Sequence, residues 1–146
     1  MVREVVFDDL QGLLRLYTQL HDNPLPEESA ELLTIWKKII SDENYHIIVA
    51  DKDQQIVSSC VIVIVPNLTH AQRPYALVEN VITDVRFRKQ GLAFSCLDYA
   101  KQIALQNNCY KIMLLTGSKK EDTLHFYERC GYNKNDKTAF IQWLNM

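Results

Sequence analysis

The sequence lacks the features that mark several common protein classes. None of its apolar runs approaches the roughly 20 residues needed to cross a membrane, and the segment Met1–Glu4 does not begin like a signal peptide. Its 16 lysines and arginines are outnumbered by 18 aspartates and glutamates. It therefore has no basic surplus of the kind that nucleic-acid-binding proteins usually carry. We expect neither a membrane nor a nucleic acid as a partner.

Signatures of metals, disulfides and several enzyme classes are also missing. The four cysteines form no Cys-x-x-Cys pair, and the four histidines share no ligand spacing. We expect no metal site, reduced cysteines that pack as small apolar residues, and a cytoplasmic location. The absence of Gly-x-Ser-x-Gly argues against a serine hydrolase of the nucleophile-elbow type. There is also neither a Walker Gly-Lys-Ser/Thr nor the spaced triple glycine of a dinucleotide fingerprint.

The pattern of apolar residues predicts an α/β fold. The length suits one domain, residues 1–146, with a sizeable buried core. Four helices are predicted. The first begins after Asp8, the second ends at about Ile40, the third spans 91–107, and the fourth runs from a Ser118-x-x-Glu121 capping box to Gly131. Strands are predicted at 2–7, 45–50, 56–65, 75–83, 110–116 and 138–144. The order β-α-α-β-β-β-α-β-α-β predicts a mixed sheet with helices on both faces.

The most informative stretch is Val78–Ala93, with the sequence VENVITDVRFRKQGLA. An apolar strand leads into a basic turn containing Gly91, and the turn opens an amphipathic helix. The first N–H groups of a helix have no internal partners, and the helix dipole favours negative charge there. A glycine also lets a ligand approach the backbone closely. The stretch predicts a phosphate-binding loop, and the alternative is an ordinary solvated turn.

These residues resemble the GNAT superfamily of acyl-CoA N-acyltransferases. Arg88-Lys89-Gln90-Gly91-Leu92-Ala93 is similar to its Arg/Gln-x-x-Gly-x-Gly/Ala signature, with alanine as the last residue. The segments at 110–112 and 126–132 are similar to the last core strand and the following helix of that superfamily. They also resemble glucosamine-6-phosphate N-acetyltransferases, but Glu79-Asn80 stands where those enzymes carry an acidic pair. The resemblance therefore does not imply that glucosamine 6-phosphate is the substrate of this protein.

The resemblance implies acetyl-CoA as the acetyl donor, held by two parts of the chain. The loop would grip the pyrophosphate through Arg86, Arg88, Lys89, Gln90, Gly91, Leu92 and Ala93. The two strands that flank the 91–107 helix would splay apart around the pantetheine arm, whose amides would pair with the backbone of Val81, Ile82 and Thr83. A backbone N–H of the same strand would hold the oxyanion.

Two side chains are candidates for proton transfer. The resemblance implies that Tyr127 protonates the departing thiolate, for which a phenol is chemically suited; the alternative is a buried core tyrosine. Glu79 is a carboxylate in an apolar strand, so it is either a base, acting directly or through water, or the partner of a cation such as Arg73. Asn80 would orient substrate or water. His70 and Arg73 either contact an anionic part of the substrate or are plain surface residues.

We therefore expect an N-acetyltransferase that moves an acetyl group to a primary amine of a small molecule by direct attack. Two alternatives stay open: a coenzyme A-binding regulatory module without turnover, and an enzyme that acetylates protein lysines or N-termini. A homodimer is a further possibility. The identity of the acceptor amine is not readable from the sequence.

Overall fold

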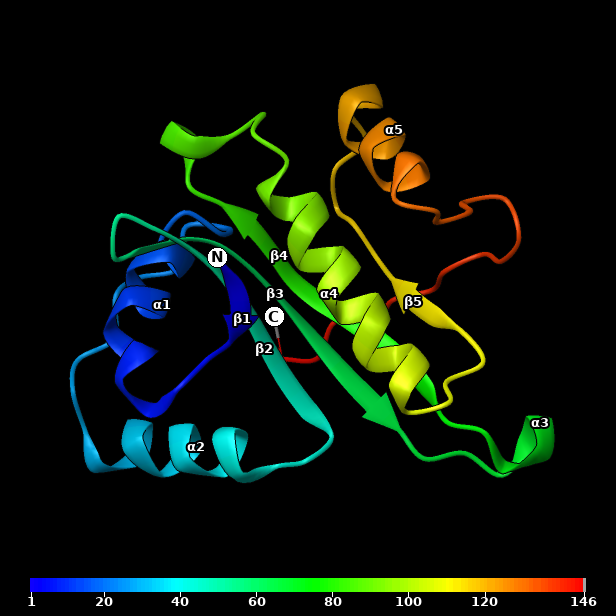
Figure 1. Ribbon diagram of the computed structural model, residues 1–146, viewed down its shortest axis with the longest axis horizontal. Helices are drawn as coiled ribbons and strands as arrows, with labels where there is room; N and C mark the ends of the chain where they lie inside the picture. Colours follow the sequence, from blue (N-terminus) through cyan, green and yellow to red (C-terminus); the bar gives the residue numbers. More distant parts are fainter. Residues whose placement is uncertain (146) are drawn as a thin grey trace.

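A five-stranded sheet, in the order β1-β2-β3-β4-β5, forms the centre of the molecule (Figure 1). The computed structural model describes residues 1–145. The first four strands pair antiparallel and β5 pairs parallel with β4, which makes the sheet mixed, as predicted. Their bounds are β1 Val2–Glu4, β2 Tyr45–Lys52, β3 Gln55–Val65, β4 Tyr75–Thr83 and β5 Ile112–Leu114.

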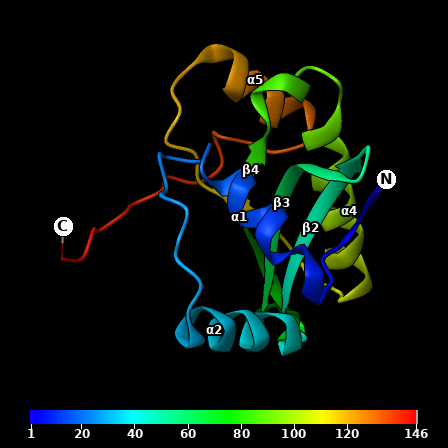
Figure 2. The same cartoon turned by 90° about the vertical axis from the view of Figure 1, so that its left-hand side faces the viewer.

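Helices cover both faces of this sheet. α1 (Leu10–Tyr17) and α2 (Ala30–Ser41) lie on one face, and α4 (Leu92–Gln106) lies on the other (Figure 2). α5 (Glu121–Arg129) packs beyond the end of β5, partly against the α4 side. Three short elements complete the chain: the 3-10 turns η1 (Phe7–Asp9) and η2 (Val85–Phe87), and the single turn α3 (Thr69–Gln72). No helix in residues 1–145 is long and apolar enough to cross a membrane.

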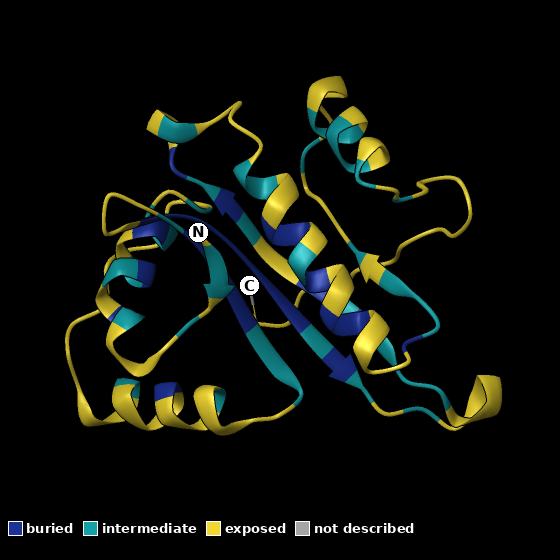
Figure 3. Ribbon diagram, viewed as in Figure 1, coloured by how far each residue is buried: buried dark blue, intermediate teal, exposed yellow. Residues whose placement is uncertain are grey.

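Alternation along the strands divides the core into two layers. In β2, Ile48 and Ala50 pack toward α4, whereas Ile47 and Val49 pack toward α1 and α2. Strands that are covered on both faces read as nearly continuous apolar runs, and β3 has this pattern. Figure 3 shows the resulting buried residues along β2, β3 and the inner side of α4. This well-packed centre fixes the position of β4, the strand that carries the candidate site.

The predicted last strand, 138–144, does not form. The segment has no strand partner, and the chain leads away from the sheet on the α1 side (Figure 2). Its apolar side chains are exposed, with Phe140 at 91% and Trp143 at 68%. The sequence pattern is strand-like, but a strand also needs an edge to pair with, and this chain does not bring the segment to one.

Several predicted boundaries are also corrected. The strand predicted at 110–116 contains only three paired residues, and Leu115, beyond them, is exposed. Asp9, not Asp8, precedes α1, and its carboxylate binds Arg3 and the Val6 N–H instead of capping the helix. Lys120 precedes α5, so the predicted capping box is absent there. Gly131 does end α5, with φ at 99°.

Candidate active site

The basic turn forms an open N-terminus for α4. Gly91 precedes the helix with φ at 78°, a left-handed conformation that glycine adopts without strain. A Cβ at this position would meet no protein atom within 4 Å, so the space beside Gly91 is open. Lys89 also has a positive φ, 62°. The turn therefore presents unpartnered backbone donors to solvent, as a phosphate site requires.

Cations of two different segments lie close to this turn. The Lys52 ammonium group, at the end of β2, donates a hydrogen bond of 2.7 Å to the Gln90 side-chain oxygen. Arg88 is exposed, and its Nε lies 3.3 Å from the Thr83 carbonyl oxygen. Arg86 instead pairs with buried Asp84 at 3.0 Å and lowers the pKa of that carboxyl to about 2. Lys52 and Arg88 thus form no ion pair with a carboxylate in the described residues, unlike Arg86. Lys52 was not predicted from the sequence.

Beyond the middle of β4, one side of its backbone is unpaired. β5 pairs with β4 only from Ala76 to Val78 and ends at Leu114. After this point β4 continues toward η2, while the chain after β5 turns to α5 (Figure 1). Within residues 1–145, the backbone from Glu79 to Thr83 therefore lacks a strand partner on the β5 side, in the segment expected to bind the pantetheine amides.

A β-bulge reshapes this same part of β4. Val61 of β3 pairs with Glu79, and Ser59 pairs with Ile82, so Asn80 and Val81 together oppose the single residue between them, Cys60. Asn80 has φ at 52°, an uncommon value for a residue within a strand. The bulge breaks the usual alternation, and two consecutive polar residues can then face the α1 side.

Contacts identify which side these residues face. Val78 and Val81 pack toward α4, whereas Ile82 packs toward α1. Asn80 is a neighbour of Tyr17, the last residue of α1. Glu79 and burial both raise the pKa of Tyr45, whose ring packs in the α1 layer; burial is the larger cause. Glu79 and Asn80 are exposed and make no side-chain hydrogen bond or ion pair within residues 1–145.

Tyr127 lies on the opposite side of the sheet. Its ring packs against the α4 layer of the core and contacts Phe126 and Tyr132 edge-on, with centroid separations of 5.2 and 6.2 Å. Burial, followed by the nearby Cys130 and Cys60, raises the pKa of the phenol, so the proton is retained at neutral pH. The hydroxyl makes no hydrogen bond in the described part of the chain and is not among its fully buried unpartnered atoms. The core-tyrosine alternative would require such a bond.

His70 and Arg73 lie at the other end of β4. His70 stacks on Tyr110 at 3.9 Å, and the Arg73 guanidinium donates to the carbonyl oxygens of Asn108 and Cys109 at 3.1 and 3.0 Å. The alternative that Glu79 pairs with Arg73 is wrong, since Arg73 is held by these carbonyls. Four residues of strand, roughly 13 Å, separate Tyr75 from Glu79. The structure therefore does not bring this pair to the candidate site.

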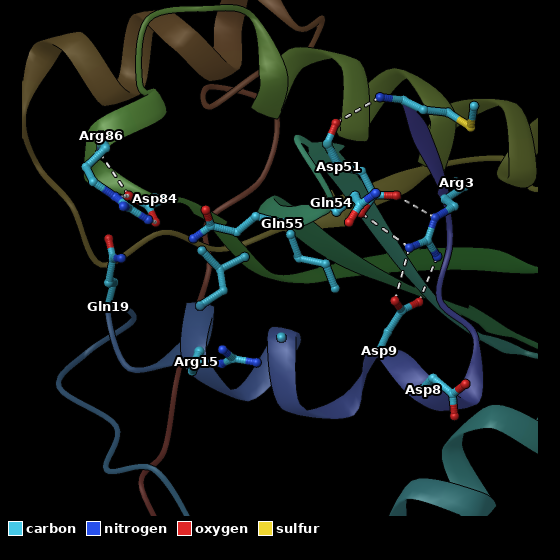
Figure 4. A pocket seen from close by; sticks show the side chains of 14 residues that line it. Arg3, Asp8, Asp9, Arg15, Gln19, Asp51, Gln54, Gln55, Asp84 and Arg86 are labelled. Atoms are coloured by element: carbon cyan, nitrogen blue, oxygen red, sulfur yellow. Dashed lines mark hydrogen bonds and ion pairs between the residues drawn. The ribbon is translucent and has the colours of Figure 1, made fainter.

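A further hollow lies elsewhere, between α1 and the β2–β3 turn. Its volume is about 790 Å³, and three arginines and four aspartates line it (Figure 4). Arg3 is already paired with Asp9 and Asp51, both at 2.7 Å, and Arg86 is paired with Asp84. The charges compensate one another, and among the predicted site residues only Arg86 reaches this hollow. We do not assign the active site to it.

The mixed sheet with helices on both faces, the bulge in β4 and the unpaired half of that strand together define an acetyltransferase type of architecture. Sequence comparison agrees, since the Acetyltransferase (GNAT) family matches residues 10–132. The chain belongs to this family of acetyltransferases. Nothing in residues 1–145 groups three or more metal-ligating side chains.

Individual relatives give the same result. Glucosamine 6-phosphate N-acetyltransferase of Trypanosoma brucei brucei is 29% identical over 83 residues, 57% of this chain and 54% of that protein. The match thus spans about half the length of this curated relative. A protein of Agrobacterium tumefaciens str. C58 assigned as an acetyltransferase has a TM-score of 0.89 at 34% identity, covering 98% of this chain and 99% of that one. The Arabidopsis thaliana glucosamine-6-phosphate N-acetyltransferase, at 20% identity, shares the fold with a TM-score of 0.86 over 99% of this chain and 98% of that one.

Proposed function

We propose that this protein transfers the acetyl group of acetyl-CoA to a primary amine of a small molecule. One observation carries the proposal: the candidate base and the candidate acid lie on opposite sides of the sheet, next to the unpaired half of β4. Glu79 is on the α1 side, and Tyr127 is on the α4 side. An amine arriving from one side and a thiolate leaving on the other need this separation.

The chain's own groups fit acetyl-CoA as a substrate. The free N–H groups after Gly91, with Lys52, Arg88 and Lys89 close by, suit a pyrophosphate. The unpaired backbone from Val81 to Thr83 suits the amides of a pantetheine arm, which would add to β4 as a strand does. Arg86 would contribute only if the ligand competed with Asp84 for its guanidinium.

The reaction then follows from the positions of the two proton-transfer groups. Glu79 removes a proton from the substrate ammonium, directly or through water, so that the nitrogen lone pair becomes available. This nitrogen forms a bond to the thioester carbonyl carbon, and a β4 backbone N–H stabilises the oxyanion. When the C–S bond breaks, Tyr127 donates its proton to sulfur. The phenol is protonated before this step, because burial raises its pKa.

A relative's name supports the acceptor class. The name of the trypanosomal relative states an amino sugar phosphate as its substrate, which supports a small amine here. The alternatives from the sequence are a binding module without turnover and an enzyme for protein lysines or N-termini. A cytoplasmic location, with which four unpaired cysteines are compatible, stays a prediction.

Free-thiol release from acetyl-CoA tests the proposal directly. The panel contains glucosamine 6-phosphate, lysine, spermidine and a lysine-containing tetrapeptide, each compared with a reaction lacking amine. Amine-dependent thiol release with one of the first three supports the proposal. Release with the peptide alone favours a protein acetyltransferase. Acetyl-CoA binding by calorimetry without release for any amine identifies a binding module.

We also propose a homodimer in which the segment 138–144 of one copy pairs with β5 of another. The segment is strand-like and exposes Phe140 and Trp143, and β5 ends the sheet with its outer edge unpaired by a strand. Light scattering should give a dimer for the full chain and a monomer for Phe140→Asp combined with Trp143→Asp. Leu68→Asp, at another exposed apolar position, is the control and should remain a dimer. A monomeric full chain contradicts the proposal.

A further inference from the structure

The Tyr17 hydroxyl is a buried polar group without a partner. In the described part of the chain, only two buried side-chain polar atoms make no hydrogen bond: this oxygen and Nε2 of His46. The His46 ring is already anchored, since its Nδ1 lies 2.6 Å from a Glu4 carboxylate oxygen. The Tyr17 side chain has no other polar atom through which it could be anchored. Unpartnered buried polar groups are rare because desolvation costs free energy, so this one needs an explanation.

Its surroundings point toward the candidate active site. Tyr17 ends α1 and packs in the α1 layer of the core, together with Tyr45. The side chains near its hydroxyl are Ser59 and Asn80, and burial raises the pKa of the phenol to about 12. The Ser59 hydroxyl already donates to the Ile48 carbonyl oxygen at 2.7 Å. Asn80 is the bulge residue, and its side chain makes no hydrogen bond within residues 1–145.

Together these side chains form a set of hydrogen-bond acceptors on one side of the bulge. Glu79 supplies carboxylate oxygens, Asn80 an amide oxygen and Tyr17 a phenol oxygen. A primary ammonium group has three N–H donors, the same number as the side chains in this set that can accept. None of the ion pairs found in residues 1–145 places a lysine or arginine against Glu79, so no protein cation occupies this position.

We propose that the Tyr17 hydroxyl binds and orients the amino group of the acceptor substrate, next to Asn80 at the bulge. Tyr17 itself is not the base, because it stays protonated at working pH. Its oxygen accepts one ammonium N–H and turns the nitrogen toward the gap between β4 and β5. The orphan hydroxyl is then a binding group that becomes satisfied only when substrate is present. This inference rests on the proposed acetyl transfer to an amine.

Tyr17→Phe tests the inference, because it removes only the oxygen. The bond exists in both the ground state and the transition state, so KM for the amine should rise about 10- to 100-fold while kcat changes by less than a few-fold. Affinity for acetyl-CoA, by calorimetry, should stay within about two-fold, and the melting temperature should be unchanged or higher, since a buried unpartnered group is lost. Tyr99→Phe, on α4 at the opposite face, is the matched control.

The possible outcomes separate the two proposals. The assay uses whichever of glucosamine 6-phosphate, lysine or spermidine the wild type acetylates fastest. An unchanged KM in Tyr17→Phe overturns the inference and leaves the proposed function standing. A melting temperature lowered by several degrees also overturns it, because the hydroxyl would then hold a structural water or side chain. A wild type that acetylates none of the three amines overturns the proposed function and the inference with it.

Discussion

Replacing Gly91 by alanine tests the anion site with a matched internal control. Gly91 and Gly131 both have positive φ, 78° and 99°, and an added Cβ meets no protein atom within 4 Å at either position. Alanine at either site should therefore cost backbone strain alone, about 1–2 kcal/mol. For a chain of this size this corresponds to a melting temperature lower by about 3–8 °C. The two variants should be equally destabilised.

Only Gly91 precedes the open helix end, so the two variants should differ in ligand binding. The alanine methyl group would occupy the space from which a pyrophosphate reaches the first N–H groups of α4. Losing one charge-assisted hydrogen bond there should weaken acetyl-CoA binding about 10- to 100-fold. Gly131→Ala should bind like the wild type. Calorimetry at equal temperature, well below both melting points, makes the comparison. Equal affinities for the two variants would refute the assignment of the loop.

Three other substitutions test separate parts of the site. Glu79→Gln should keep the melting temperature, since Glu79 makes no ion pair in the described chain. Its rate should fall most on the acidic limb of the pH–rate profile, where the amine is protonated. An acidic limb identical to that of the wild type would make Glu79 a structural residue. Tyr127→Phe should lower kcat about 10²-fold with acetyl-CoA affinity within a few-fold, whereas Tyr132→Phe, whose ring centroid lies 6.2 Å away, should not; unchanged turnover would mean that another group protonates sulfur. Asp84 has a lowered pKa of about 2 because of Arg86, so it should stabilise the fold above about pH 4 and lose this contribution as the pH falls toward 2. Urea unfolding should therefore show a smaller difference between wild type and Asp84→Asn at pH 2 than at pH 5, and a constant difference would contradict this account.

The central elements were predictable because the physical signal is local. Strand 75–83 and helix 91–107 match β4 and α4 to within one residue at each end. Each element is covered by the core, so its apolar pattern is complete. The segment 138–144 has an equally good strand pattern and forms no strand, because pairing depends on an edge supplied from elsewhere in the fold. Sequence periodicity reports burial preference, not the presence of a partner.

For the candidate site too, residues close together in the sequence could be predicted, and residues from distant elements could not. Glu79 and the Arg88–Ala93 loop were found because they lie within fifteen residues of each other on one strand–turn–helix unit. Tyr17 and Lys52 come from distant elements, and neither residue stands in a motif. The only sequence feature that could have indicated Tyr17 is its position on a leucine-rich helix face. His70 and Arg73 were placed by closeness in sequence to β4. The first and last residues of this nine-residue strand are separated by roughly 26 Å, so His70 and Arg73 lie at the wrong end.

The burial of the cysteines has a practical consequence for the thiol-release assay. All four thiols are free, and burial raises the pKa of each one. The thiolate is the form that reacts with disulfide reagents, so the folded protein should consume such a reagent slowly while released coenzyme A reacts at once. Unfolded chains expose four reactive sulfurs each. The blank rate, measured before acetyl-CoA is added, therefore reports the fraction of misfolded protein in each variant, in the same cuvette as its activity.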